Sequence, residues 1–252
     1  MIFNGQYGNV KVIKQRRKDE IAMKVYDITG PIRDGMWNYE PPFPTFHLKP
    51  LPQPEWVASR VYCEIFDGIH SQTGTYLETP AHFYGNDNCY LMTDVPVEKL
   101  VCIPCAILML PGLDTPGEER PAITAEMLAA CPGADEIQPG DAILVGTGWG
   151  KHWMDPCYLD ASPYFTYDAM QYLVEKKPFL LGTDFSRWEN FAHPQNLFPL
   201  FYAANILMLA PLVNLENIPA TRVSLTALPL NIPGTSCIPC RAVVTVEEEG
   251  NL

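Results

Sequence analysis

The sequence predicts a single α/β domain that is built on a mixed β-sheet with few helices. Three observations predict it. The 252 residues contain no internal repeat and no low-complexity segment that would separate two domains. Short apolar runs alternate with turn signals, and one segment shows helical spacing. The 25 prolines, about twice the usual share, favour short elements that are joined by stiff turns.

Several segments have the composition of strands. The first covers residues 24–29 and ends at Gly30 and Pro31. The others are apolar runs that we expect to be buried: residues 101–110 after Pro104, 141–148, 179–184, 206–212 and 241–246. Residues 164–176 carry apolar side chains at helical spacing, which predicts a helix. The proline-rich residues 39–47 exclude a helix or a central strand there.

Charge and apolar runs limit the partners of the chain. The formal net charge of −12 repels phosphate backbones and anionic lipid, so we expect no nucleic-acid partner and no membrane partner. The longest apolar run, residues 206–213, is far shorter than the ~20 residues of a membrane span. No basic stretch followed by an apolar one begins the chain, and the eight cysteines are sparse, which predicts a cytoplasmic protein with reduced thiols.

Residues 1–24 differ from the rest because they hold a basic cluster at residues 14–18. We interpret them as a solvated arm or a short helix that can pack on a neighbouring subunit. Nucleic-acid contact is disfavoured because the cluster lacks accompanying aromatic residues. Residues 25–252 then form the folded domain.

The richest segment for chemistry is residues 67–85. Glu78 and His82 are four residues apart on either side of Pro80. In a straight strand they would be ~13 Å apart, so they can cooperate only if Pro80 bends the chain. The alternative is a surface turn whose polar residues have no chemical role.

The order of residues in this segment resembles a known signature. Gln72-Thr-Gly-Thr-Tyr76-Leu-Glu78-Thr-Pro-Ala-His82 is similar to His-x-Gly-Thr-His-x-Asp-x-Pro-x-His of the cyclase, or kynurenine formamidase-like, family of hydrolases. Further pieces agree in order, at residues 27–36, 139–149, 182–186 and 228–242. The resemblance covers about residues 25–246. It implies the swivelling β/β/α fold of that family and a homo-oligomer.

In that family the two histidines and the aspartate of the signature bind a divalent metal, Zn or Mn, and a later His and Glu complete the site. The corresponding positions here hold Gln72, Tyr76 and Glu78, followed by Phe198 and Ala210. Phe and Ala offer no ligand atom, and a phenol would have to lose its proton about three pH units above neutrality. Because zinc sites use three or four Cys, His or carboxylate ligands, we assign no metal ligand. The spacing also argues against His193.

The last histidine of the signature, which is the acid/base of the family, is retained as His82. We therefore predict a hydrolase of a small amide, lactam or ester, arylformamidase-like by resemblance and so tied to tryptophan catabolism. His82 is its general acid/base and Glu78 orients it. Gln72 and Tyr76 are candidates to bind substrate and stabilise an oxyanion. The alternative is a non-catalytic relative that binds a small aromatic ligand.

Three more residues are candidates for substrate contact, two of them by the same resemblance. Trp37 and Trp149 belong to motifs that border it in the family, so they are candidates to stack on a flat ligand. Asp184 is either a ligand contact or half of a structural ion pair.

Two identical Cys-Ile-Pro-Cys pairs remain to be explained, Cys102 with Cys105 and Cys237 with Cys240. They form a structural zinc site if their strands are neighbours, a redox disulfide within one pair, or buried thiols. We expect buried thiols, since both pairs lie where strands start and Cys there serves as a small apolar filler.

Overall fold

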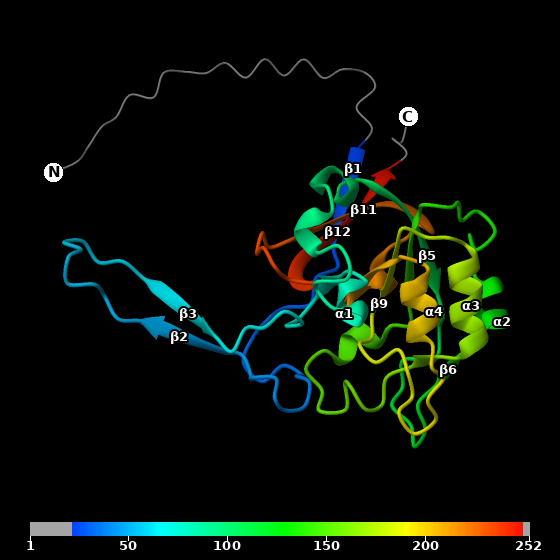
Figure 1. Ribbon diagram of the computed structural model, residues 1–252, viewed down its shortest axis with the longest axis horizontal. Coiled ribbons are helices and arrows are strands. Elements are labelled where there is room, and N and C mark those ends of the chain that lie inside the picture. Colours follow the sequence, from blue (N-terminus) through cyan, green and yellow to red (C-terminus); the bar gives the residue numbers. More distant parts are fainter. Residues whose placement is uncertain (1–21, 249–252) are drawn as a thin grey trace, which may run out of the picture.

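A computed structural model of the chain describes residues 22–248. Seven strands form a barrel-like mixed sheet in the order β12-β11-β5-β7-β9-β10-β4, and β4 also pairs with β12, which closes the ring (Figure 1). An eighth strand, β1, pairs with β12 outside the ring. The bounds are β1 Ala22–Asp27, β4 Tyr76–Glu78, β5 Ile103–Met109, β7 Ala142–Gly146, β9 Leu180–Thr183, β10 Leu207–Ala210, β11 Arg222–Pro229 and β12 Cys237–Glu248.

The parallel strands β5, β7, β9 and β10 are the apolar runs of the sequence, as expected for strands that are buried on both faces. Alternate residues point to two separate cores. In β5, Ala106 and Leu108 pack with the helices, whereas Cys105 and Ile107 pack inside the barrel. This confirms the predicted α/β fold with a mixed sheet and few helices.

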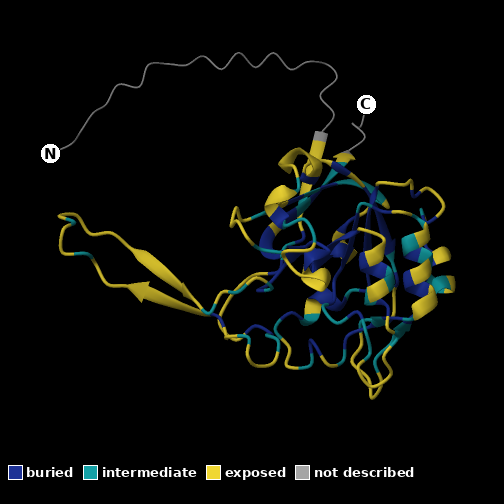
Figure 2. Cartoon of the chain, viewed as in Figure 1, coloured by how far each residue is buried: buried dark blue, intermediate teal, exposed yellow. Residues whose placement is uncertain are grey.

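The helices are short and α2, α3 and α4 lie together against one side of the sheet (Figures 1 and 2). Their bounds are α1 Ala81–Tyr84, α2 Ala125–Ala129, α3 Tyr167–Glu175 and α4 Phe198–Ala203, with 3₁₀ turns at Met92–Asp94, Val97–Leu100, Trp149–His152 and Leu215–Asn217. Thr124 is the N-cap of α2, and its hydroxyl accepts a hydrogen bond from the backbone N–H of Met127. No helix among the described residues is long and apolar enough to cross a bilayer.

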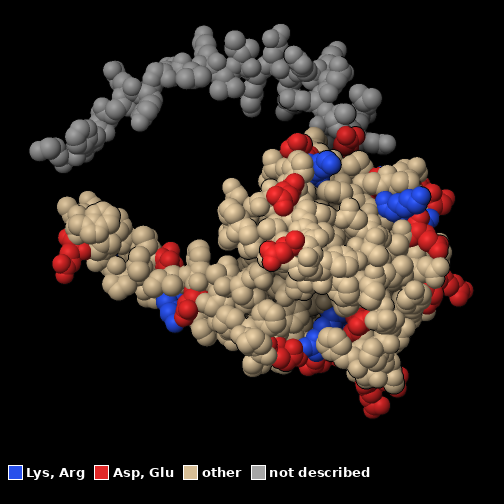
Figure 3. Space-filling model, in the orientation of Figure 1, with Lys and Arg blue, Asp and Glu red and all other residues tan. Residues whose placement is uncertain are grey.

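Two small sheets complete the fold. Strands β6, Ala122–Ile123, and β8, Tyr164–Phe165, pair near the helices. Strands β2, His47–Leu51, and β3, Cys63–Asp67, form a hairpin that projects away from the barrel (Figure 1). On the face drawn in Figure 3, the Lys and Arg side chains of the described residues lie apart from one another, so this face presents no continuous basic surface.

Several expectations differ in detail from the structure. The strand expected after Pro104 begins one residue before it, because Pro104 lies opposite Ser224 of β11 within the pairing. The helix expected at residues 164–176 starts only after β8. Residues 1–21 of the predicted basic arm lie outside the described residues, and residues 22–24 belong to β1.

The two Cys-Ile-Pro-Cys pairs do not meet, because β11 separates β5 from β12 in the sheet. All eight cysteines are free thiols. Cys105, Cys237 and Cys240 are buried as expected, but Cys102 is exposed, which corrects that part of the expectation.

Candidate active site

A cavity of about 190 Å³ opens at the edge of the barrel where β4, α1 and α4 meet the loop after β9. Its lining combines a polar floor with aromatic walls. The lining residues are Tyr39, Glu40, Phe43, Gln72, Tyr76, Glu78, His82, Ser186, Arg187, Trp188, Glu189, Phe191, Phe198, Tyr202 and Met208.

The bend that Glu78 and His82 require is present. Strand β4 ends at Glu78, and Pro80 at φ −56° and ψ −15° begins helix α1. The Thr79 N–H donates to Ser236 O at 2.9 Å, which fixes the bend against β12. As a result His82 Nε2 lies 3.9 Å from Glu78 Oε2.

The carboxylate of Glu78 is buried and surrounded by donors. Oε1 accepts a hydrogen bond from the Tyr202 hydroxyl. Oε2 accepts from Gln72 Nε2 at 3.4 Å and from the Cys237 thiol at 3.3 Å. Burial raises the pKa of Glu78, and the nearby His82 and these donors act in the opposite direction. The ionised form of Glu78 is therefore stabilised only by the groups that contact it.

Cys237 is the first residue of β12 and lies opposite Glu78 in the strand pairing. Its Sγ is 3.1 Å from His82 Nδ1. Burial, followed by the negative charge of Glu78, raises the pKa of the Cys237 thiol, so the thiol keeps its proton near neutral pH. Sequence reasoning placed Cys237 among buried thiols and missed its place beside His82, since only the β4–β12 pairing brings the two together.

Neutral phenols occupy the other side of the floor. The Tyr76 and Tyr39 hydroxyls are 3.1 Å apart, and Gln72 Nε2 donates to Tyr76 Oη at 3.3 Å. Burial raises the pKa of Tyr39 and raises that of Tyr76 well above its ordinary value. One of the two phenol protons is used in their mutual hydrogen bond. The other is not used in that bond and can serve as a donor.

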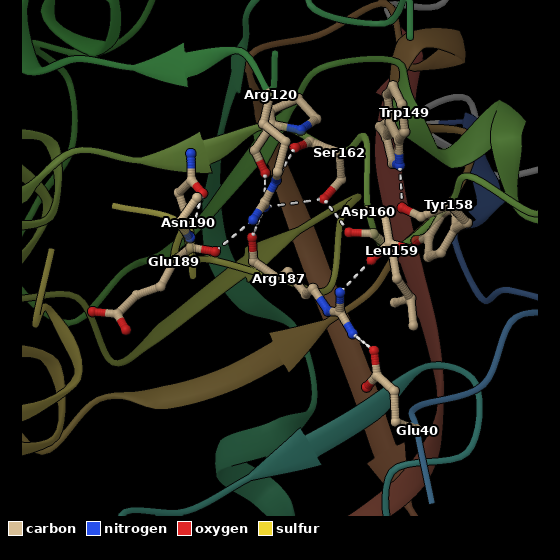
Figure 4. Close-up of polar contacts among 12 residues, drawn as sticks. Glu40, Arg120, Trp149, Tyr158, Leu159, Asp160, Ser162, Arg187, Glu189 and Asn190 are labelled. Atoms are coloured by element: carbon tan, nitrogen blue, oxygen red, sulfur yellow. Dashed lines mark hydrogen bonds and ion pairs between the residues drawn. The ribbon is translucent and has the colours of Figure 1, made fainter. Parts of the chain in front are cut away.

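The wall formed by residues 186–191 is held in place by Arg120 (Figure 4). The Arg120 guanidinium donates to the carbonyl oxygens of Arg187 and Glu189, each at 2.6 Å, and to those of Ser162 at 2.7 Å and Pro163 at 3.0 Å. Arg187 in turn pairs with Asp160 and with Glu40 at the cavity.

Three of the predicted substrate-binding residues do not line this cavity. Trp149 is fully buried and its indole N–H donates to Tyr158 O at 2.9 Å. Trp37 packs in the core, where its ring stacks on Tyr158 at 5.2 Å. The Asp184 carboxylate accepts the backbone N–H groups of residues 147–149, and burial raises its pKa to about 6. The structure therefore places these three side chains in the core, outside this cavity.

His193 likewise lies away from the floor and borders a different cavity. In contrast, Gln72, Tyr76, Glu78 and His82 all come together, and they are joined by Tyr39, Tyr202 and Cys237.

The metal site of the family does not fit the residues at its own positions. The Gln72 amide and the Tyr76 phenol are hydrogen-bonded to each other. Phe198 packs its ring on Tyr202 at 5.8 Å, and Ala210 is buried in β10. None of the four supplies an anionic or imidazole ligand.

A different trio in the described residues could hold a divalent ion. Glu78, His82 and Cys237 each offer one ligand atom, and these atoms lie within 4.8 Å of one another. Carboxylate, imidazole and thiolate are the ligand types that zinc prefers. Binding would require Cys237 to lose its proton.

Comparison with known proteins agrees with this architecture. A family model described as "Putative cyclase" matches residues 26–190. Isatin hydrolase from Roseibium aggregatum is 29% identical over 194 residues, which cover 71% of this chain and 72% of that protein. A solved structure described as a potential metal-dependent hydrolase with cyclase activity superposes with a TM-score of 0.67 at 25% identity and covers 90% of this chain and 100% of its own. An isatin hydrolase bound to the product analogue thioisatinate has a TM-score of 0.71 at 21% identity, covering 90% and 93% of the two chains.

Proposed function

Because this chain belongs to the cyclase family, we propose that it is a hydrolase of a small amide, lactam or ester whose carbonyl binds in the 190 Å³ cavity. The observation that carries the proposal is the pairing of His82 with the buried Glu78 carboxylate at the floor. A buried carboxylate that contacts a solvent-accessible imidazole is the arrangement of a general acid/base.

The contacts of His82 select the nitrogen that takes the proton. When the Cys237 thiol donates to Glu78, the Nδ1–H of His82 points at Sγ. Nε2 then carries the lone pair and accepts a proton from water. The imidazolium that forms is stabilised by Glu78, whose Oε2 is 3.9 Å from Nε2. After water attacks the carbonyl carbon, His82 returns that proton to the leaving nitrogen or oxygen.

The developing oxyanion requires a donor that does not ionise. The Tyr39–Tyr76 pair has one hydroxyl proton free to donate, and Gln72 polarises the pair by donating to Tyr76. We therefore assign oxyanion stabilisation to the phenols, with Gln72 as the group that orients them.

A zinc ion held by Glu78, His82 and Cys237 would act as a Lewis acid and lower the pKa of a bound water. Such an ion would bind the same imidazole that the proposed proton transfer uses. Zinc binding and proton transfer by His82 therefore exclude each other, and we propose proton transfer.

The experiment begins with a substrate screen of formamides, lactams including isatin, and lactones. Arylformamides are included because the resemblance implies a role in tryptophan catabolism. On any substrate found, His82→Ala is expected to lower turnover by ~10²–10⁴ and Tyr76→Phe by ~10²–10³. The melting temperature of His82→Ala should change little because its side chain is 42% exposed.

His193→Ala is the matched control, since His193 is exposed and lies outside the cavity floor. A His82→Ala protein that keeps full turnover contradicts the proposal. A screen without turnover, in which a flat aromatic acid raises the melting temperature, favours the second candidate: a non-catalytic relative that binds a small aromatic ligand. Phe198 and Ala210, at positions where the family carries metal ligands, are the observation in favour of that candidate.

We also propose that the protein works in the cytoplasm, supported by its eight free thiols. Thiol titration of the denatured protein, purified without oxidant, should count all eight.

A further inference from the structure

The candidate cavity carries more negative than positive charge. Three of its lining residues are acidic, Glu40, Glu78 and Glu189, and Arg187 is the only Lys or Arg among the described residues that line it. The guanidinium of Arg187 pairs with both Glu40 and Asp160, so its charge is already balanced (Figure 4). A ligand in the cavity therefore meets a negative electrostatic potential.

The groups that surround Glu78 do not cancel its charge. The proposed function uses its ionised carboxylate, and the three side chains that donate to it, Tyr202, Gln72 and Cys237, are neutral. His82 is neutral whenever it is ready to accept a proton from water. Before the reaction, the floor of the cavity thus keeps a full negative charge.

The excess of negative charge continues beyond the wall of the cavity. A second cavity of about 380 Å³ shares Arg187 and Phe191 with the first. Glu118 and Glu119 line the same space as Arg120, the other cation of this wall. The charge of Arg120 is therefore opposed by carboxylates as well, and it does not reverse the potential in the first cavity.

Most of the remaining lining is aromatic. The aromatic lining residues are Tyr39, Phe43, Tyr76, Trp188, Phe191, Phe198 and Tyr202. The face of an aromatic ring attracts a cation, and rings of this kind bind quaternary ammonium ligands in other proteins. The wall already holds one cation in this way, because the Arg187 guanidinium lies 5.3 Å from the centre of the Phe191 ring.

We propose that the substrate is a small ester or amide that carries an ammonium group, an inference that rests on the hydrolase function proposed above. A neutral substrate would gain nothing from the carboxylates of the lining, and an anionic substrate would be repelled by them. An ammonium group is attracted both by the carboxylates and by the ring faces. Hydrolysis releases a carboxylate, which the same charges repel, so the acid product leaves the cavity readily.

Glu189 is the carboxylate that we assign to the ammonium group. Its Oε1 accepts the backbone N–H of Leu197 at 2.7 Å, which fixes the side chain at the cavity. Glu78 is instead committed to His82, and Glu40 is committed to Arg187. Phe198 lies one residue after Leu197 and offers an aromatic ring to the same cavity.

The test compares two ligands of nearly the same shape that differ by one positive charge, choline and its carbon isostere 3,3-dimethylbutan-1-ol. Calorimetric titration of the full-length protein should give a dissociation constant for choline that is at least about 5-fold lower than that for the alcohol. Neither ligand can be hydrolysed, so the measurement does not depend on turnover. The acetate esters of the two alcohols should show the same preference in kcat/KM.

Two variants remove the two kinds of contact. Glu189→Gln keeps an oxygen for the Leu197 N–H and removes the charge, and Phe198→Leu keeps an apolar side chain and removes the ring. Each should lower the preference for choline by at least about 2-fold. The matched control is Glu98→Gln, because Glu98 is exposed and lines a cavity that shares no residue with this one.

The ratio of the two affinities separates a lost contact from a damaged fold, since misfolding weakens both ligands alike. Equal affinities in wild type overturn the proposal, as does a preference that Glu189→Gln and Phe198→Leu both leave unchanged. A loss of preference in Glu98→Gln as large as in Glu189→Gln overturns the assignment to this cavity.

The hydrolase function is tested separately by the turnover of His82→Ala. A preference for choline in a protein that turns over neither ester supports the cation site and contradicts hydrolysis of these esters. Turnover that depends on His82, together with equal affinities for the two alcohols, overturns the ammonium substrate and leaves the hydrolase in place.

Discussion

Arg120 gives the sharpest prediction about how the cavity is held. Its guanidinium contacts carbonyl oxygens of two separate segments, residues 162–163 and the cavity wall at Arg187 and Glu189. Arg120→Met removes every donor while it keeps an unbranched side chain. Hydrogen bonds from a charged group contribute about 1.5–3 kcal/mol each. The two 2.6 Å bonds to the wall alone therefore predict a loss of about 3 kcal/mol or more.

For a chain of this length 1 kcal/mol shifts the melting temperature by about 2–4 °C, so Arg120→Met should melt about 6–12 °C lower than wild type. Calorimetry measures this shift, and hydrogen exchange should show faster exchange in residues 186–191. Arg33→Met is the control because Arg33 is exposed. An Arg120→Met protein that melts within 2 °C of wild type, with unchanged exchange in the wall, would refute the reasoning.

The remaining predictions concern single groups. Tyr202→Phe leaves Glu78 Oε1 without its donor, so urea denaturation should show a loss of about 1–3 kcal/mol, and unchanged stability would contradict this role. Elemental analysis of protein purified without chelator should find less than about half an equivalent of Zn or Mn. A full equivalent that disappears in Cys237→Ser would instead favour metal catalysis. The raised pKa of Asp184, about 6, means that the folded state holds a proton at pH 4–6 that the unfolded state has lost. The free energy of unfolding of wild type should therefore fall by about 2–3 kcal/mol relative to that of Asp184→Asn as pH rises through that window. If urea denaturation shows that the difference between the two proteins does not change with pH, the prediction is wrong.

The elements that sequence patterns predicted are those whose signal is local. Continuous apolar runs predicted β5, β7, β9 and β10. Strands that are buried on both faces are apolar at nearly every position, so the run itself is the signal. Strand β4 has three residues, and its place depends on two partners that are far away in the sequence. The hairpin escaped prediction because Pro50 interrupts β2 and the residues of both strands are exposed, so they carry no pattern of a buried face.

The site divides in the same way. Glu78 and His82 are four residues apart, and Pro80 bends the chain between them, so their pairing could be proposed from the sequence. Tyr202 and Cys237 reach Glu78 from positions 124 and 159 residues away. No local pattern encodes such contacts. They follow from the closure of the ring, in which β4 lies between β10 and β12.

Asp184 shows the opposite limit. The sequence left it as a ligand contact or as half of a structural ion pair. A carboxylate at the end of a buried strand can also serve the backbone, and here Asp184 satisfies the N–H groups of residues 147–149. Only the direction of the side chain distinguishes the two roles, and the sequence does not contain that direction.

The floor and the walls of the cavity differ in how they are fixed. Ring closure places Glu78 and Cys237 on adjacent strands, so the floor has the rigidity of the sheet. The walls come from segments with little secondary structure: Tyr39 and Phe43 precede the hairpin, and residues 186–191 follow β9. Arg120 fixes the second segment, while the first runs directly into the β2–β3 hairpin. The proton chemistry therefore resides in the sheet, whereas the fit of a substrate depends on walls that these two segments supply.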